Sequence, residues 1–224
     1  MIDLTMTAAR RPDLFERTLR SFQDMLFDRL PVRKFYLNID PIWGTPDDAD
    51  QVEAIARSYF DTVVRRPELP SYGGAVKWLW SQPETDWFLH LEDDWVLSHK
   101  ISLRKLRKQM AEPGVGQIAI CNWSRLGRRR RTPRIGVGPL FASRPFAALA
   151  SAHMNADLDP DKQFKIGLNP ALFDAVARYR AMYFGGPFTK QTAIDIGRDW
   201  RDKRGIEKHI IDGVSTWTSE ATAR

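Results

Sequence analysis

The sequence has little cysteine: Cys121 is the single one among 224 residues. One thiol cannot form an internal disulfide, and a cage of cysteine ligands for structural zinc is excluded. No apolar run approaches the roughly 18 residues that a membrane-spanning helix requires. The first residues lack the basic and apolar segments of a signal peptide, so a cytoplasmic protein is expected. Hydrophobic residues make up 43% and charged residues 28%, which excludes a disordered or collagen-like chain and is typical of a globular domain.

Positive charge is unevenly distributed along the chain. The formal net charge is +6, and six arginines lie within ten residues: Arg125, Arg128, Arg129, Arg130, Arg131 and Arg134. This short cluster equals the whole formal excess, so the rest of the chain is close to neutral.

Predicted strands and helices alternate along the first 122 residues. Strands are predicted at residues 2–7, 35–39, 62–64, 87–91 and 117–121. Helices are predicted from Arg11-Pro12-Asp13 to residue 27 and then at residues 47–60, 76–80 and 102–110. This alternation predicts right-handed βαβ units and an α/β fold whose twisted, mostly parallel sheet is flanked by helices. Most of the eight tryptophans have apolar neighbours and are expected in the core.

The pattern weakens after Asn122. Gly, Pro and Arg dominate residues 124–145, which are expected to be irregular, and two further helices are predicted at residues 170–180 and 192–203. No repeat or low-complexity linker separates the two parts. We therefore expect one domain over residues 1–224, with an irregular C-terminal subregion.

Three adjacent acids, Glu92-Asp93-Asp94, directly follow the apolar strand predicted at residues 87–91. Ligands of open α/β sheets bind beyond the carboxyl ends of the strands. Burying these carboxylates costs several kcal/mol unless cations or hydrogen-bond donors compensate. Mg²⁺ or Mn²⁺ is the natural partner, since either takes one or two carboxylates and leaves positions for phosphate oxygens. The alternative is an acidic loop that caps the next helix in solvent.

Other polar residues end the first two predicted strands. Thr5 and Thr7 end the first strand and Asp40 follows the second, so a parallel sheet brings all three to one edge. Hydroxyls and a carboxylate there could hold the base and ribose of a nucleotide. Each residue alone could also be an ordinary cap at the end of a strand.

Five separated segments carry a more specific pattern. They are Leu4-Thr5-Met6-Thr7 with Arg10-Arg11-Pro12, Asn38-Ile39-Asp40, Gly73-Gly74-Ala75-Val76-Lys77-Trp78, Phe88-Leu89-His90-Leu91-Glu92-Asp93-Asp94-Trp95 and Ile194-Asp195-Ile196-Gly197-Arg198-Asp199-Trp200. In this order they resemble the GT-A-fold nucleotide-sugar glycosyltransferases, in particular the family 2-like members. The resemblance covers most of the chain except about residues 123–165.

The resemblance implies a single GT-A-like, Rossmann-like domain that binds a nucleoside diphosphate sugar, with UDP as the nucleotide, and Mn²⁺ or Mg²⁺. Residues 1–122 would be the half that binds the nucleotide sugar, and residues 123–224 the half that binds the acceptor and supplies the catalytic base. The acidic triplet resembles the D-x-D motif of the family, so Asp94 would hold the metal. Thr7 and Asp40 would contact the base and ribose, and Lys77 would approach the diphosphate. The full set of implied donor-binding residues is Thr5, Thr7, Arg10, Asp40, Lys77, Glu92, Asp93 and Arg198.

The segment around Asp195 resembles the E-D motif of the family, which supplies the catalytic base of inverting enzymes. Ile194 replaces the first acid, so the resemblance gives this role to Asp195 alone. A positioned base contributes ~10²–10⁴ in rate; the alternative is an acid that only stabilises a helix N-terminus. His209 matches a position where some members place a further metal ligand, although a lone histidine can also be structural. His90 is interpreted as a satisfied core histidine.

The arginine cluster lies where glycosyltransferases recognise acceptors. Arg128, Arg129, Arg130 and Arg131 repel one another unless a polyanion lies against them, and arginine pairs well with phosphate. Trp123 offers a face on which a base can stack. Nucleic acid or an anionic lipid surface would fit, and an enzyme that glycosylates a hydroxymethylated base in DNA would combine these features. The alternative is a solvated loop without a partner.

The sequence therefore predicts a metal-dependent transferase that moves a sugar from a nucleoside diphosphate to an acceptor hydroxyl with inversion. Two other classes are alternatives. A metal-dependent phosphodiesterase or nuclease would use Glu92, Asp93, Asp94 and Asp195 as a two-metal site. A non-catalytic nucleic-acid-binding module would need only the arginine cluster.

Overall fold

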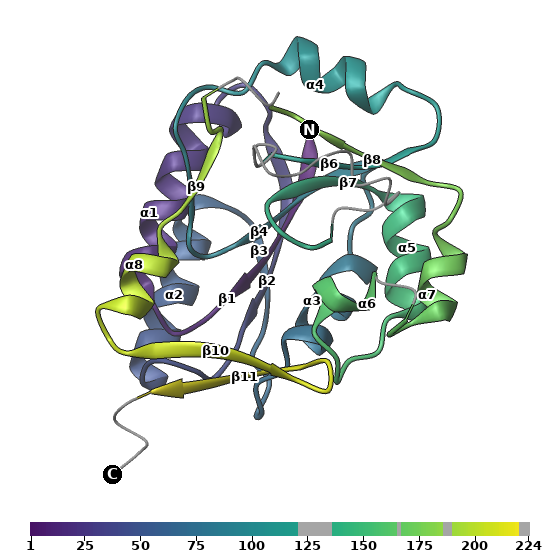
Figure 1. The fold of residues 1–224 in the computed structure, drawn as a ribbon. Coiled ribbons are helices and arrows are strands. Elements are labelled where there is room, and N and C mark those ends of the chain that lie inside the picture. Colours follow the sequence, from purple (N-terminus) through teal and green to yellow (C-terminus); the bar gives the residue numbers. More distant parts are fainter. Residues whose placement is uncertain (121–135, 165–166, 186–189, 220–224) are drawn as a thin grey trace.

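A seven-stranded sheet forms the centre of the molecule in the computed structural model, which describes residues 1–120, 136–164, 167–185 and 190–219 (Figure 1). Its strands are β1 (Ile2–Ala8), β2 (Val32–Ile39), β3 (Thr62–Arg65), β4 (Trp87–Glu92), β6 (Val115–Ala119), β7 (Leu140–Ser143) and β8 (Arg180–Tyr183). They lie in the order β3-β2-β1-β4-β7-β6-β8. Strands β3, β2, β1 and β4 are mutually parallel and β6 is parallel to β8, whereas β7 is antiparallel to both neighbours. The α/β fold with a mostly parallel sheet is confirmed.

Helices cover both faces of this sheet (Figure 1). On one face lie α1 (Pro12–Phe22), which continues as one π-helical turn, η1 (Gln23–Phe27), and α2 (Pro46–Tyr59). On the other lie α3 (Tyr72–Ser81), α5 (Arg144–His153), α6 (Pro160–Gln163) and α7 (Pro170–Ala175). Helix α4 (Leu103–Met110) lies at one end of the sheet, beside β6. Local sequence explains the helix starts: Thr45 and Asp48 form a reciprocal capping box at α2, and Ser71 caps α3.

Side-chain alternation along the strands produces two cores, one on each face of the sheet. In β1, Leu4 and Met6 join the core under α1 and α2, while Thr5 and Thr7 point to the opposite face. There, Trp80 of α3 and Phe146 of α5 belong to a second core. Thr5 and Thr7 are thus buried on the α3 side of the sheet, and Thr7 lies near the carboxyl end of β1.

Two small antiparallel pairs attach the C-terminal part of the chain. Strand β5 (Trp95–Leu97) pairs with β9 (Ala193–Asp195), and β10 (Ile206–Ile211) forms a hairpin with β11 (Val214–Ser219). The β5–β9 register sets Asp195 opposite Trp95. Helix α8 (Gly197–Asp202) then follows directly. This pairing brings the candidate base next to the acidic triplet.

Three predictions for the C-terminal half were wrong. The helix expected at residues 192–203 begins only at Gly197, because residues 193–195 pair with β5 instead. The helix expected at residues 170–180 ends at Ala175, since the chain turns into the edge strand β8. Residues 140–145 are not irregular: β7 and the start of α5 occupy them. The boundary at residue 122 lies outside the described residues, and the division into two halves stays a prediction.

The tryptophans divide between the core and the candidate site. Trp78, Trp87 and Trp95 pack against the core, as expected for most of the tryptophans. Among the described tryptophans only Trp80 is fully buried, at 1% exposure. Trp43, Trp200 and Trp217 are half-buried and lie together: the Trp43 ring centroid is 4.7 Å from that of Trp217 and 5.9 Å from that of Trp200. Trp43 and Trp217 line the candidate site, and Trp200 packs against Trp43.

Candidate active site

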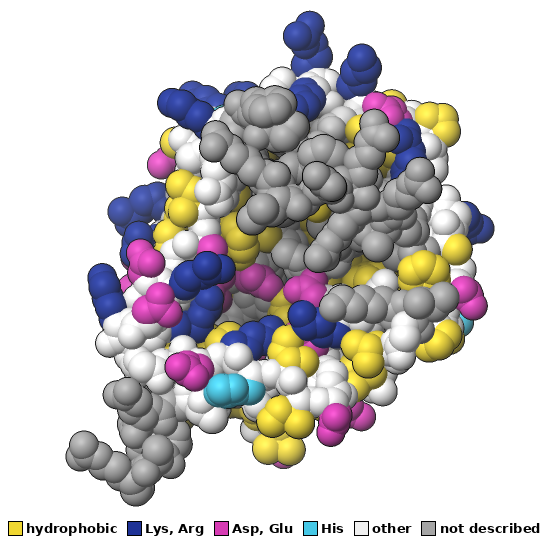
Figure 2. All heavy atoms as spheres, in the orientation of Figure 1, with side chains coloured by type: hydrophobic (Ala, Val, Ile, Leu, Met, Phe, Trp, Pro, Cys, Tyr) yellow, Lys and Arg dark blue, Asp and Glu magenta, His cyan; other side chains and the backbone are white. Residues whose placement is uncertain are grey.

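A cavity of about 400 Å³ opens at the carboxyl ends of β1, β2 and β4. Its lining residues are Thr7, Ala8, Ala9, Arg11, Asp40, Ile42, Trp43, Tyr72, Glu92, Asp93, Asp94, Asp161, Asp195, Arg198, Arg201, Lys208 and Trp217. Figure 2 shows acidic and basic side chains gathered around a hollow near the centre of the view. Six carboxylates face four cationic side chains, a formal excess of two negative charges. The parallel sheet therefore assembles the predicted edge, with the acids concentrated at one cavity.

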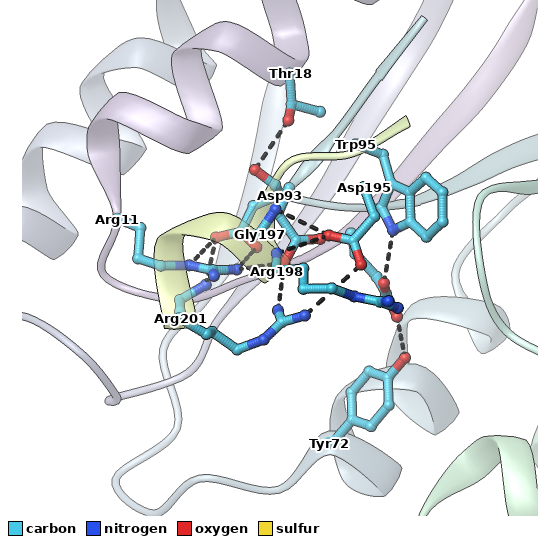
Figure 3. Close-up of polar contacts among 12 residues, drawn as sticks. Arg11, Thr18, Tyr72, Asp93, Trp95, Asp195, Gly197, Arg198 and Arg201 are labelled. Carbon is cyan, nitrogen blue, oxygen red and sulfur yellow. Dashed lines mark hydrogen bonds and ion pairs between the residues drawn. The ribbon is translucent and has the colours of Figure 1, made fainter. Parts of the chain in front are cut away.

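Asp93 and Arg11 form the buried base of this cavity (Figure 3). The Arg11 guanidinium donates to both oxygens of Asp93, with Nε 3.3 Å from Oδ2, and the Ala9 N–H donates to Oδ2 at 3.0 Å. Asp93 and Arg11 are 2% and 5% exposed. Burial acts to lower the pKa of Arg11, but Asp93 and Asp94 outweigh it and raise that pKa. Asp93 is thus a structural acid that ties the β4 end to the start of α1.

Asp94 lies between two arginines. Its Oδ2 accepts from Arg11 Nη2 at 3.2 Å and from Arg201 Nη1 at 3.1 Å. Burial raises its pKa, the charge of Asp93 adds to that effect, and the arginines oppose it. A Cβ on Gly197 would meet Oδ2 at 1.9 Å, so only glycine lets the start of α8 approach this carboxylate so closely.

Asp195 joins the cavity from the β9–α8 junction (Figure 3). Its Oδ1 accepts the backbone N–H of Gly197 at 2.9 Å and that of Arg198 at 3.0 Å. Its Oδ2 lies 3.6 Å from Arg201 Nη2. One oxygen therefore caps α8 while the carboxylate remains half-exposed at the cavity. The capping role and the proposed catalytic role are compatible, because they use different oxygens.

Glu92 is held by two donors. The Tyr72 hydroxyl donates to Oε1, and Trp95 Nε1 donates to Oε2 at 2.9 Å. Burial raises the pKa of Glu92, and the nearby charge of Asp94 raises it further against these hydrogen bonds. Both carboxylate oxygens are fixed toward the protein, so Glu92 is a rigid wall of the cavity.

Two of the three residues expected at the nucleoside lie at the cavity. Thr7 and Asp40 both line the cavity; Asn38 Nδ2 donates to Asp40 Oδ1 at 2.9 Å, and burial raises the pKa of Asp40. Thr5 lies deeper, fully buried, with its hydroxyl 2.8 Å from His90 Nδ1. It is a core residue and does not line the cavity.

His90 is buried as predicted, at 0% exposure, but only one of its ring nitrogens is satisfied. Nε2 has no hydrogen-bond partner among the described residues, and the ring lies edge-on to Trp80 with centroids 5.7 Å apart. Burial lowers the pKa of His90 to about 3. The histidine is therefore neutral at physiological pH.

Three other predicted site residues do not line the cavity. Lys77 Nζ donates to the carbonyl of Met154 at 2.8 Å on the α3 side. Arg10 Nη1 reaches the carbonyl of Gly44 at 3.4 Å. His209 points outward from β10, its Nε2 2.9 Å from the hydroxyl of Thr218. Lys77 and Arg10 therefore do not lie where donor binding would place them, and His209 does not lie where a metal ligand would.

Lys208, the neighbour of His209 on β10, faces the cavity instead. Its Nζ lies 3.0 Å from Oδ2 of the buried Asp159 and within 5.4 and 5.5 Å of the rings of Tyr72 and Trp217. Strand alternation explains why Lys208 and not His209 faces the cavity, because adjacent residues of a strand point to opposite faces. Lys208 is a cation held in place by an acid and two aromatic faces.

Sequence reasoning missed several lining residues: Arg11, Trp43, Tyr72, Arg201, Lys208 and Trp217. Arg11 had a usable signal, since it stands beside Pro12 at the helix start that follows β1. Its guanidinium carbon lies 4.7 Å from the Trp43 ring centroid and 5.2 Å from that of Trp200. Lys208 and Trp217 lie on the C-terminal hairpin, for which no local pattern gave a position. Trp123 and Arg128, Arg129, Arg130 and Arg131 lie outside the described residues.

The residues present fit a divalent ion bound together with phosphate. Both arginine contacts of Asp94 use Oδ2, and Oδ1 has no hydrogen-bond partner in the described part of the chain. No cluster of three or more His, Cys, Asp or Glu side chains suited to hold a metal occurs among the described residues. A metal that takes one or two carboxylates and completes its shell with phosphate oxygens and water needs no such cluster.

Comparisons with known proteins place this geometry in context. No protein-family profile matches the chain, and no curated protein sequence is similar to it. Solved structures do match. A mannosyltransferase from Pyrobaculum calidifontis, in complex with GDP-Man and Mn²⁺, is 13% identical with a TM-score of 0.57, over 81% of this chain and 54% of that one. The chain thus spans about half the length of that enzyme.

Two further structures are similar. Residues 1–349 of TarS from S. aureus match with 12% identity and a TM-score of 0.55, over 81% of this chain and 57% of that one. HddC from Yersinia pseudotuberculosis matches with 11% identity and a TM-score of 0.58, over 90% and 97% of the two chains. At these identities the likeness establishes the fold, and the chain has the α/β fold of the GT-A-type glycosyltransferases.

Proposed function

We propose that this protein transfers a sugar from a nucleoside diphosphate donor to an acceptor hydroxyl. The observation that carries the proposal is the convergence of Asp40, Asp94 and Asp195, from three separate segments, on one cavity. A nucleotide sugar needs a site for its nucleoside, neutralisation of its diphosphate, and a base for the acceptor. This cavity offers residues for all three tasks.

The similar structures support this donor class. The mannosyltransferase holds GDP-Man and Mn²⁺. A glucosyl-3-phosphoglycerate synthase from Mycobacterium tuberculosis, 14% identical with a TM-score of 0.50, holds UDP and Mn²⁺. We propose a uridine diphosphate sugar as the donor, with Asp40 and Thr7 at the nucleoside. The cavity gives no group that selects among donor sugars.

Asp94 is the proposed ligand of Mn²⁺ or Mg²⁺ through Oδ1. When bound, the ion supplies Lewis-acid stabilisation of the charge on the departing diphosphate. The formal excess of two negative charges on the cavity lining favours a cation of this charge. Glu92 and Asp93, both hydrogen-bonded to protein donors, shape the wall around it.

Lys208 and Arg198 are the proposed cations for the diphosphate. Lys208 is held at the cavity by Asp159. The Arg198 side chain is exposed at the cavity and makes no ion pair with any described residue. Charge-assisted hydrogen bonds from such groups to phosphate are about twice as strong as neutral ones. These two residues take over the role that the resemblance implied for Lys77.

Asp195 is the proposed catalytic base. It takes a proton from the acceptor hydroxyl as that oxygen attacks the anomeric carbon, the bond from that carbon to the diphosphate oxygen breaks, and inversion results. Arg201, close to its Oδ2, holds the carboxylate in place. A polyanionic acceptor, including a hydroxymethylated base in DNA, stays a prediction, because the residues on which it depends lie outside the described part of the chain.

The test is a thermal-shift screen of UDP and GDP sugars with Mn²⁺, followed by measurement of nucleoside diphosphate release. A ligand at 100 times its Kd should stabilise the fold by about 2.7 kcal/mol. Stabilisation by a nucleotide sugar with slow release of nucleoside diphosphate would support the proposal. Hydrolysis of DNA with Mg²⁺ and no response to any nucleotide sugar would favour the nuclease instead.

A further inference from the structure

We infer that α4 is a docking surface for an anionic membrane, separate from the candidate active site. Five basic residues, Lys100, Arg104, Lys105, Arg107 and Lys108, lie within nine positions that contain no acid. All five are exposed. In the part of the chain that the structure describes, none of them makes an ion pair. The surface is therefore a strip of cations that no described acid neutralises.

The positive charge of this strip contrasts with the net charge of the rest of the chain. Removing these five and the six arginines of residues 125–134 from 34 Lys and Arg residues leaves 23, against 28 Asp and Glu. The rest of the chain is thus net acidic, and the positive charge is concentrated in two short segments. Concentration of this kind attracts a polyanion far more strongly than the same charge spread evenly.

Packing fixes the cations of α4 toward solvent. Leu106 is 1% exposed, Leu103 and Met110 pack against the core, and Gln109 Nε2 donates to the carbonyl of Tyr183 at 3.0 Å. Helix rotation is set by these contacts, and the remaining positions are basic. Figure 2 shows Lys and Arg side chains projecting from the top of the molecule, where α4 lies in Figure 1.

The form of the strip favours a membrane over nucleic acid. Proteins bind single-stranded nucleic acid in a basic groove with aromatic faces for stacking, but the sequence of α4 contains no aromatic residue. Its one amide side chain, Gln109, is buried, so no Asn or Gln of the helix is left to pair with adenine. Clusters of four to eight basic residues on a helix are typical of binding to anionic lipids, at about 1 kcal/mol for each residue near the surface.

The position of α4 leaves the cavity free when it is bound. No α4 residue lines the cavity, and Figure 1 shows α4 at the opposite end of the sheet from the β10–β11 hairpin. Among the described residues no helix is long and apolar enough to cross a bilayer. Lipid bound at α4 would therefore leave the cavity uncovered.

The experiment is sedimentation with vesicles of phosphatidylcholine, with or without one third phosphatidylserine. The variant R104Q/R107Q/K108Q keeps the helix, since glutamine is nearly as good a helix former as arginine or lysine. The control R17Q/R20Q/R57Q removes the same charge from exposed positions on α1 and α2. We expect binding to the anionic vesicles alone, weakened by salt, with at least ~10-fold loss of partitioning in the α4 variant and less than twofold loss in the control.

Several outcomes would overturn the inference. They are equal binding to both vesicle types, no binding to anionic vesicles at low salt, or equal losses in the two variants, which would show an effect of net charge alone. Loss of duplex DNA binding in the α4 variant with unchanged vesicle binding would make α4 a nucleic-acid surface. All variants are also tested for nucleotide-sugar binding, which this surface should not affect.

Discussion

Individual side chains at the cavity each perform two tasks. Asp195 caps α8 with one oxygen and presents the other to the cavity. Asp94 contacts two arginines through Oδ2 and leaves Oδ1 for a ligand. Because the two oxygens of each carboxylate have different partners, a substitution can remove the chemical role of the side chain and keep its structural contacts.

Replacement of Asp195 by asparagine should abolish the base and keep the cap. Asparagine retains an oxygen that can accept the Gly197 and Arg198 N–H groups, but it cannot take a proton. We expect nucleotide-sugar affinity within about twofold of wild type and turnover lowered by at least ~10². Steady-state kinetics with direct titration of the donor measures both. Normal turnover, or failure mainly through weaker donor binding, would place the base elsewhere.

Replacement of Lys208 by alanine should weaken binding of nucleoside diphosphate by about 10- to 100-fold, as expected for ~1.5–3 kcal/mol from hydrogen bonds to a charged group. Binding of the nucleoside without phosphate should not change. His209→Ala is the matched control, since its side chain points to the other face of β10. Calorimetry on both variants gives the comparison. A larger effect of His209→Ala would restore the metal-ligand prediction for that residue.

At the scale of elements, the close approach of α8 to β4 organises the site. Gly197→Ala would place a methyl group 1.9 Å from Asp94 Oδ2, so either α8 or the carboxylate must move. We expect a loss of about 1–3 kcal/mol in the free energy of unfolding, typical of overpacking, together with weaker metal-dependent donor binding. Gly138→Ala is the control, because nothing lies within 4 Å of its added Cβ. Urea denaturation of both variants measures the difference.

The sequence predicted well the elements that a local apolar pattern defines. It predicted poorly the strands whose partners lie far along the chain. The βαβ units up to β6 follow from apolar spacing and from Pro12, and the acidic triplet was placed correctly at the end of β4. Strands β5, β7, β8, β9, β10 and β11 were not predicted, because short strands depend on partners far along the chain. Which side of β10 faces the cavity depends on its pairing with β11. For this reason the sequence alone could not show that Lys208, and not His209, lies at the cavity.

For the whole molecule, buried His90 predicts an acid-sensitive fold. Its pKa is lowered to about 3 by burial, while in the unfolded chain it is about 6.5. Between these pH values the unfolded state binds a proton that the folded state does not, so stability rises with pH up to about 6.5 and falls on acidification. The contribution of this residue is about 1.4 kcal/mol for each pH unit.

The variant His90→Asn tests this assignment. Asparagine can accept or donate to the Thr5 hydroxyl but does not titrate, so its free energy of unfolding should depend less steeply on pH between about 3 and 6.5. Buried carboxylates such as Asp3 add a pH dependence of their own that both proteins share. Parallel slopes for the two proteins in urea denaturation across this range would contradict the role of His90.

The central claim is that this cavity binds a nucleoside diphosphate sugar through Asp94 and a divalent ion. Calorimetric titration of UDP and GDP sugars into wild type and Asp94→Asn, each with and without Mn²⁺, tests it most directly. We expect wild type to bind a nucleotide sugar, with binding that Mn²⁺ strengthens at least ~10-fold. We expect no Mn²⁺ effect in the variant, whose thermal unfolding should remain cooperative. Unchanged Mn²⁺-dependent binding by Asp94→Asn would contradict the metal assignment, and no binding of any nucleotide sugar by wild type would contradict the proposed function itself.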